Sequence, residues 1–368
     1  MKFYRKILLV IIVLVFMHII WNAWKKYVYK GVLFEGFSSE PDPVATKEVL
    51  GIMNSNPTLI QPISDRAADQ PLKEYIIKAS ANSAISGRYA STDMIKYVLS
   101  RGCRFLDFEV FLMKDDNSKP MLIVSSSSDP SFKVIDTDKN IALTLDDALA
   151  ASVDNAFAPS SSGKSNIPPP PNPRDPLFIQ LRIKSNDPSI YKLIAKSVDY
   201  HLKGTLYDGK IDNNTVLSKL MGKTVLILDK SLNRNYADLA KCVDKEKNCY
   251  DLSKYVSIES GSDTLYTQKY SDVMNQEYVP VHILDKCDRC TDVKYMRILM
   301  PDSITSTPKN PDMKTLKQFF TNYASQIVAY RFNVLDDGIV KYEKFFDDNK
   351  LAIVPLSYAI SYYKKQDP

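Results

Sequence analysis

The sequence predicts an α/β protein: a closed (β/α)8 barrel of the TIM type, preceded by one N-terminal transmembrane helix. Three observations lead to this prediction. A long apolar run opens the chain, strand-like and helix-like patterns alternate through most of the rest, and about eight strand-like stretches occupy a length that suits a barrel. An open doubly wound sheet is the alternative, but no G-x-G-x-x-G loop follows the first strand.

The transmembrane helix is predicted from the run Ile7 to Trp24 (ILLVIIVLVFMHIIWNAW), which has no formal charge and is long enough to span a bilayer. A cleaved signal peptide has a shorter apolar core and a small-residue cleavage site, whereas this run exits into Trp-Lys-Lys-Tyr. Residues 1–30 are therefore expected to be a single-pass membrane anchor with basic flanks, and residues 31–70 a linker. Basic residues flank both ends almost equally, so the positive-inside rule only slightly favours a cytosolic N-terminus with the bulk of the chain on the non-cytosolic side.

The barrel is expected over residues 71–335, and residues 336–368 are expected to be a C-terminal extension that packs on it. Strand-like stretches occur at 74–79, 104–111, 120–124, 177–183, 224–228, 255–258, 295–299 and 326–332. Helical patterns occur at 92–100, 143–152, 189–202 and 313–323. Strands that alternate with helices imply parallel strands joined by crossovers.

Composition excludes a disordered chain. Of the 368 residues, 45% are hydrophobic and 25% charged, enough for one large domain or two small ones with a real core. The 48 basic and 43 acidic residues are interspersed and sum to +5, which is typical of a mixed solvated surface and argues against a nucleic-acid partner.

One low-complexity stretch, residues 156–175, interrupts the barrel. It is rich in Ser and Pro, with a proline run at 168–171, and is predicted to be a surface loop because such a composition cannot pack a core. The proline run allows contact with a protein partner, although a plain spacer is the favoured alternative.

Four of the five cysteines form two close pairs, C-x6-C (Cys242, Cys249) and C-x2-C (Cys287, Cys290). They predict two disulfides or one zinc site, and free thiols stay open as well. A non-cytosolic location favours disulfides. Cys103 is expected to be a small buried hydrophobe.

The first predicted strand ends in Ser80-Ala81-Asn82-Ser83, and the second is entered through Gly102-Cys103-Arg104-Phe105-Leu106-Asp107-Phe108-Glu109. With later segments, and in order, they resemble the X and Y regions of phosphoinositide-specific phospholipase C. In that family the first strand ends in Ser-x-His-Asn-Thr, and Gly-Cys-Arg then leads into a second strand that carries Glu-x-Asp. Residues 119–124, 175–182, 221–223, 296–298 and 322–332 resemble later strands, so the resemblance spans roughly residues 70–335 and implies a PLC-like phosphodiesterase barrel.

The resemblance implies a phosphoric diester hydrolase with two histidines, one that deprotonates the inositol 2-hydroxyl and one that protonates the leaving group. This chain lacks both. Ala81 stands at the first histidine position, and the stretch around Ser125 holds no histidine at the second. The three histidines of the chain lie at other positions in the sequence, namely His18, His201 and His282.

The family also implies calcium held by Asn, Glu, Asp and Glu. Asn82 is retained, and Asp107 and Glu109 occupy the Glu-x-Asp positions with their lengths exchanged, but the fourth ligand position is Arg182. We expect its guanidinium to pair with both carboxylates and replace the ion. No cofactor is therefore expected, and calcium only if the family site survives. The structural alternative for Asn82 is that it only satisfies backbone groups of its loop.

The sequence therefore favours a membrane-anchored, catalytically inactive PLC-like barrel that serves as a binding or structural module. Arg297 is a candidate to contact an anionic phospholipid head group, and so is Lys223. The alternative is an active phosphatidylinositol phosphodiesterase with Asp107 or Glu109 as base, although a carboxylate paired with a cation is a poor base. A scaffold that contacts proteins through the Pro-rich loop is the third hypothesis.

Overall fold

The computed structural model describes residues 43–54, 56–114, 118–127, 143–157, 166–242, 249–262, 264–276, 280–285, 287, 289–302 and 309–365. The expected anchor, the first part of the expected linker and the middle of the Pro-rich insert lie outside these residues. Within the described ranges, no helix is long and apolar enough to cross a membrane.

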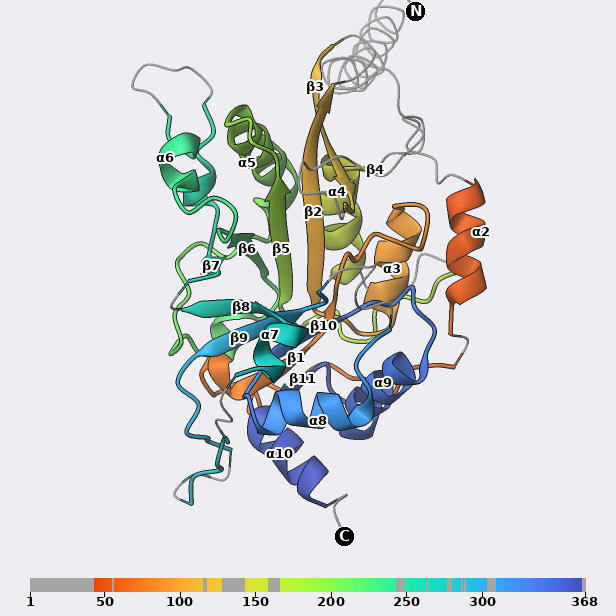
Figure 1. The fold of residues 1–368 in the computed structure, drawn as a ribbon, viewed down its shortest axis with the longest axis vertical. Helices are drawn as coiled ribbons and strands as arrows, with labels where there is room; N and C mark the ends of the chain where they lie inside the picture. Colours follow the sequence, from red (N-terminus) through yellow and green to blue (C-terminus); the bar gives the residue numbers. More distant parts are fainter. Residues whose placement is uncertain are drawn as a thin grey trace, which may run out of the picture. The chain divides into compact units, whose positions relative to one another are not determined.

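Eight parallel strands form a closed ring, which confirms the predicted barrel (Figure 1). Their order around the ring is β1 (Tyr75–Ser80), β2 (Phe105–Lys114), β5 (Leu177–Lys184), β6 (Thr224–Asp229), β7 (Ile258–Ser260), β8 (Leu265–Lys269), β9 (Met296–Met300) and β10 (Ile327–Tyr330). The ring closes because β1 pairs in parallel with both β10 and β2. Closure places the C-terminal ends of all eight strands at one face, here called the mouth.

One expected strand lies outside the ring. The stretch at 120–124 forms β3 (Pro120–Ser125), which pairs antiparallel with β2, and β4 (Leu143–Thr144) pairs antiparallel with β3. The eighth ring strand is β8, which the sequence patterns missed because its five residues, Leu-Tyr-Thr-Gln-Lys, are mostly polar and contain no β-branched run. A further short strand, β11 (Ile353–Pro355), pairs antiparallel with the first half of β1.

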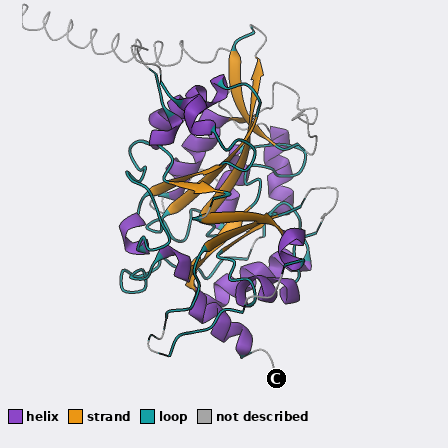
Figure 2. Cartoon of the chain, turned by 60° about the vertical axis from the view of Figure 1, so that its left-hand side comes forward, coloured by secondary structure: helices purple, strands orange, loops and turns teal. Residues whose placement is uncertain are grey.

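Helices lie around the strands (Figure 2). They are α2 (Pro43–Ile52), α3 (Thr92–Ser100), α4 (Leu145–Ala156), α5 (Ser189–Leu202), α6 (Tyr236–Ala240), α7 (Tyr270–Met274), α8 (Met313–Thr321), α9 (Asp337–Asn349) and α10 (Leu356–Lys364), with 3-10 turns η1 (Leu72–Glu74), η2 (Leu217–Leu220) and η3 (Leu252–Lys254). The bounds of α3 and α5 agree with the predicted helices. Side-chain caps begin several of them: Ser91 accepts from the amide of Met94, and Asp336 from that of Ile339.

Two apolar clusters sandwich the strands. One fills the barrel interior and includes Ile77, Phe178 and Ile298, while the other lies between the outer faces of the strands and the helices. Near the mouth the inward side chains become polar, with Asp107 on β2 and Arg182 on β5. The polar end of an otherwise apolar barrel is therefore where a site can form.

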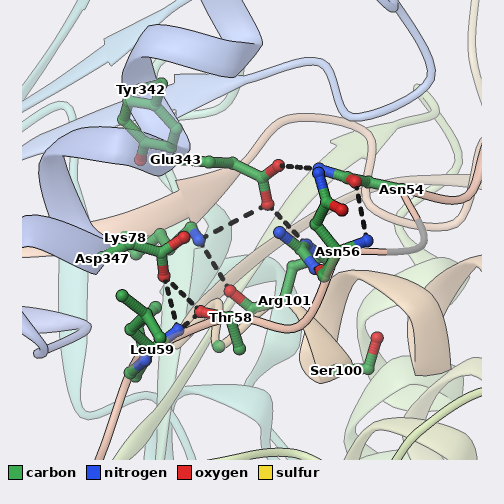
Figure 3. A network of polar contacts seen from close by, with 12 residues as sticks. Asn54, Asn56, Thr58, Leu59, Lys78, Ser100, Arg101, Tyr342, Glu343 and Asp347 are labelled. Carbon is green, nitrogen blue, oxygen red and sulfur yellow. Dashed lines mark hydrogen bonds and ion pairs between the residues drawn. The ribbon is translucent and has the colours of Figure 1, made fainter.

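A buried polar network joins α9 to β1 and to the segment after α2 (Figure 3). Glu343 accepts from Arg101 Nε at 2.6 Å and from Asn54 Nδ2 at 3.4 Å, and Lys78 Nζ lies 3.6 Å from its Oε1. Asp347, one turn further along α9, accepts from Thr58 Oγ1 and from the amide of Leu59. These bonds hold Asn54, Thr58 and Leu59 against the barrel.

Candidate functional site

The sequence-predicted residues Asn82, Asp107, Glu109 and Arg182 meet at the mouth. Alternate residues of a strand share a face, so Asp107 and Glu109 both point inward from β2. Arg182 points inward from the neighbouring β5, opposite Glu109 in the strand register. Asn82 follows β1 at φ 45°, a left-handed conformation that asparagine tolerates better than most residues.

Arg182 binds all three of the others. Its Nε and Nη2 donate to the two carboxylate oxygens of Asp107 at 2.7 and 2.6 Å, and its Nη1 donates to Glu109 Oε1 at 2.6 Å. Nη2 also donates to Asn82 Oδ1 at 2.7 Å. These four residues are called the Arg182 cage below. The two-point contact with Asp107 is the strong geometry of a guanidinium–carboxylate pair.

Burial and charge set the electrostatics of the cage. The Asp107 side chain is fully buried and that of Arg182 is 16% exposed. Burial works against the charge of Arg182, but Asp107 and Glu109 outweigh it and raise the pKa of the guanidinium above its usual value. The cage thus holds a permanent cation between two carboxylates.

Backbone groups hold the cage carboxylates from the other side. The amide of Asn82 donates to Asp107 Oδ2 at 2.9 Å, and that of Ser127 donates to Glu109 Oε2 at 3.1 Å. Ser83 ties the loop to β2, because its amide donates to the Asp107 carbonyl and its hydroxyl accepts from the Asp107 amide. The loop after β1 therefore orients Asp107 toward Arg182.

The cage does not suit calcium. Calcium needs several oxygen ligands, and the Arg182 guanidinium already takes oxygens from Asn82, Asp107 and Glu109. A divalent ion among them would also lie against a fixed positive charge. Across the part of the chain that the structure describes, no group of three or more His, Cys, Asp or Glu side chains is placed to hold a metal.

The two expected histidine positions hold no acid or base. Ala81 is buried, and its side chain belongs to the interior apolar cluster. Ser125 ends β3 and pairs with Glu109 in the strand register. The two histidines among the described residues are paired elsewhere: His201 lies 3.3 Å from Asp146, and His282 3.0 Å from Asp292.

Arg297 and Lys223 lie apart from the cage. Arg297 is the second residue of β9, between the inward-facing Met296 and Ile298, and its Nη1 donates to the carbonyl of Tyr323 at 3.0 Å. Lys223 immediately precedes β6, at the end of the barrel opposite the mouth. Contact of Arg297 and Lys223 with an anionic phospholipid head group therefore stays a prediction that is separate from the cage.

The four paired cysteines form two disulfides, Cys242–Cys249 and Cys287–Cys290. Both link cysteines that are close in sequence. Cys103 is a free, fully buried thiol. Burial raises its pKa to about 12, so it has little thiolate character.

Sequence reasoning missed Asp229, the last residue of β6, which pairs with Arg182 in the strand register. Its Oδ1 accepts from the amide of Ser231 at 2.9 Å. The signal was present in Thr224-Val225-Leu226-Ile227-Leu228-Asp229, because a carboxylate that ends an apolar strand lies at the mouth of a parallel barrel.

Exposed side chains surround the mouth on three loops. Leu232 follows β6 and is 52% exposed, and Leu335 follows β10 and is 61% exposed. Two exposed cations accompany them, Arg88 on the loop after β1 and Arg234 on the loop after β6. These four residues are called the mouth rim below. Apolar groups beside cations are typical of surfaces that contact anionic membranes.

Comparisons with known proteins agree with this fold. Residues 68–230 match the model of the X domain of phosphatidylinositol-specific phospholipase C. The crystal structure of PLC21 from L. pealei is 14% identical with a TM-score of 0.54, and that of PLC21 from S. officinalis is 13% identical with a TM-score of 0.51. Each comparison covers 82% of this chain and 39% of the other, so this chain spans about two fifths of their length.

A calcium-dependent phosphoinositol-specific phospholipase C from Pseudomonas sp. is 12% identical, with a TM-score of 0.44 and coverage of 82% of this chain and 100% of that one. Among curated proteins, none matches the sequence significantly. At these identities the likeness concerns the fold alone. The residues at the mouth determine which chemistry this barrel can perform.

Proposed function

We propose that this chain, whose barrel is that of the phospholipase C-like phosphodiesterases, is a membrane-anchored binding module without phosphodiesterase activity. The observation that carries the proposal is the position of Arg182. Its guanidinium lies among the oxygens of Asn82, Asp107 and Glu109, where the family resemblance implies a calcium ion.

Three further observations argue against catalysis. Ala81 and Ser125 cannot exchange protons near neutral pH. Asp107 and Glu109 would have to act as base while the Arg182 guanidinium donates hydrogen bonds to the oxygens that would take up the proton. The groups that the family resemblance implies for proton transfer and for the transition-state charge, two histidines and calcium, are therefore replaced by Ala81, Ser125 and Arg182.

A membrane role is supported by the contact between α2, the first described helix of the chain, and the mouth. Glu48 of α2 accepts from Ser86 Oγ at 2.6 Å and from the amide of Arg88 at 3.0 Å, so α2 touches the loop after β1. The first described helix after the proposed anchor therefore lies against a loop of the mouth, and this loop also carries Arg88 of the mouth rim.

The proposed ligand class is an anionic phospholipid surface, contacted by Arg88 and Arg234 with Leu232 and Leu335 alongside. The two disulfides support the proposed non-cytosolic location, because disulfides persist in oxidising compartments.

Hydrolysis of phosphatidylinositol by the full chain, reconstituted in vesicles with and without calcium, tests the proposal. We expect no turnover under either condition. Turnover that Asp107→Asn abolishes would instead establish the active hydrolase. Asp208→Asn, at an exposed loop position, is the matched control for loss of one carboxylate.

A charge reversal tests the role of Arg182 directly. Arg182→Glu would place a fourth oxygen ligand beside Asn82, Asp107 and Glu109, which is the donor set that the family resemblance associates with calcium. We expect calcium to raise the melting temperature of this variant and leave that of the wild type unchanged. Tight calcium binding by the wild type would remove the basis of the proposal.

A further inference from the structure

The inward side chains of the barrel form layers, and their chemistry changes sharply from one layer to the next. In a barrel of this type each layer takes four side chains from alternate strands, and the strand registers assign them. The apolar floor is Phe105, Ile227, Leu265 and Ile327. The next layer toward the mouth is Ala79, Gln180, Ser260 and Ile298, and the one above it is Asp107, Asp229, Thr267 and Ala329. Arg182 lies one layer higher.

Polar atoms in the two middle layers have no protein partner. Both polar atoms of the Gln180 side chain, Ser260 Oγ and Thr267 Oγ1 are buried and make no hydrogen bond within the described ranges of the chain. Gln180 and Ser260 are fully buried residues of the same layer, and Thr267 belongs to the layer directly above. An unmade hydrogen bond costs about 1 to 3 kcal/mol for each buried group, so native proteins satisfy such groups with ordered water.

Small side chains share the layers with these atoms. The interior of an eight-stranded barrel is just wide enough for side chains to fill it. Ala79 occupies one of the four positions in the layer of Gln180 and Ser260, and Ala329 one of the four in the layer of Thr267. Two methyl groups fill far less of the barrel than the Ile and Phe side chains of the floor, so the two middle layers hold less side-chain volume, and the volume left beside the unpartnered polar atoms is called the space below.

The charges around this space favour a neutral occupant. Arg182 lies above it and disfavours a cation, while Asp107 and Asp229 lie in its upper layer and disfavour an anion. The Gln180 side-chain amide offers two hydrogen-bond donors and an acceptor, and the hydroxyls of Ser260 and Thr267 can each donate or accept a hydrogen bond. This set complements molecules whose hydroxyl groups also donate and accept.

We propose that the space enclosed by Ala79, Gln180, Ser260, Thr267 and Ala329 is a solvated chamber that binds small uncharged hydroxylic molecules, either water or a small polyol. The chamber lies inside the barrel above the apolar floor and beneath Arg182, and its upper layer includes Asp107 of the Arg182 cage. It does not depend on whether the mouth binds lipid or hydrolyses it, so the two proposals can fail independently.

A high-resolution crystal structure of the full chain, crystallised without polyols, tests the chamber. We expect at least one ordered water bonded to Gln180 and to Ser260 or Thr267. Thr267→Val, which keeps the shape of the side chain and removes its hydroxyl, should lose or shift a water. Ile298→Val, an apolar change in the same layer as Gln180, should leave the waters in place.

Thermal unfolding with glycerol as the probe separates the two occupants. A saturable rise in melting temperature that Thr267→Val abolishes identifies polyol binding, while an equal, unsaturable rise in both proteins identifies water as the occupant. The proposal is overturned if the chamber is dry and Gln180→Leu raises the melting temperature, because an apolar side chain would then suit the space better. Direct hydrogen bonds between Gln180 and protein atoms, with no water, would overturn it equally. If Gln180→Leu does not fold, Ser260→Ala replaces it.

Discussion

Arg182 and Asp107 form a two-point ion pair between neighbouring strands, with both carboxylate oxygens within 2.7 Å of the guanidinium nitrogens. The Asp107 side chain is fully buried, and a buried charge without a partner is costly. The pair therefore links the chemistry of the mouth to the stability of the barrel.

Arg182→Ala should destabilise the barrel by about 3 to 5 kcal/mol, because it leaves Asp107 and Glu109 as uncompensated buried charges. Urea unfolding of the full chain measures the change. Arg88→Ala, which removes an exposed cation from the mouth rim, is the control and should shift stability by less than about 0.5 kcal/mol. Equal midpoints for the two variants would mean that the cage carboxylates are stable without Arg182.

Glu343 should make stability depend on pH in the acid range. Burial opposes its ionisation, but Lys78 and Arg101 outweigh burial and hold the pKa of Glu343 below its usual value. A carboxyl whose folded pKa is depressed stabilises the fold above its unfolded value of about 4.3. This contribution is lost as pH falls through the folded pKa.

Glu343→Gln should therefore lower stability at neutral pH by about 3 to 5 kcal/mol, because it leaves Lys78 and Arg101 without their carboxylate. Urea midpoints measured between about pH 3 and pH 7 should rise less with pH in the variant than in the wild type. Parallel pH curves for the two proteins would contradict the assignment of this slope to Glu343.

Two glycine-to-alanine changes should act in opposite directions. A Cβ at Gly338, in the first turn of α9, would lie 2.6 Å from the carbonyl oxygen of Pro311 and 2.9 Å from Asn310 Cβ. Gly338→Ala should cost about 1 to 3 kcal/mol through overpacking. A Cβ at Gly51 in α2 meets nothing within 4 Å, so Gly51→Ala should stabilise by up to about 1 kcal/mol through helix propensity. Thermal unfolding compares the pair, and two changes of the same sign would refute the contact of Gly338 with residue 311.

The mouth rim should control attachment to anionic vesicles. A fragment from residue 43 onward retains every described element and lacks the proposed anchor. Replacing both Leu232 and Leu335 by Ser should weaken its binding to vesicles rich in anionic lipid about tenfold or more. The reason is that the apolar area that each Leu side chain would bury in the membrane interface is removed. Arg234→Glu should also weaken it, in a salt-dependent way.

Vesicle co-sedimentation measures this binding. Leu59→Ser is the matched control, since Leu59 is 57% exposed and lies outside the mouth loops. Identical losses at Leu59 and at the rim would show that exposed apolar area, rather than the mouth, drives attachment.

Local patterns were sufficient for some elements. The helices at Thr92–Ser100 and Ser189–Leu202 have apolar residues at helical spacing, and their predicted bounds agree with the structure. Membership of the ring was harder to predict. The strand at Pro120–Ser125 has as strong a β pattern as any ring strand, yet it pairs antiparallel with β2, whereas the more polar Leu265–Lys269 completes the barrel. A strand pattern reports side-chain alternation, and it carries no information on the partner.

By itself, the sequence determined which chemistry the mouth can hold. Ala81 and Ser125 cannot move protons near neutral pH, and Arg182 cannot ligate a cation, whatever the fold around them. Only the tertiary structure decided which groups meet. Arg182 contacts Asp107 across 75 residues of chain, and Arg297 points away. Gln180, Ser260 and Thr267 lie in neighbouring layers of the barrel, and their buried polar atoms make no hydrogen bond among the residues that the structure describes. The physical reason is strand register, which sets these contacts between segments far apart in the chain and follows from packing and closure of the whole ring rather than from any local pattern.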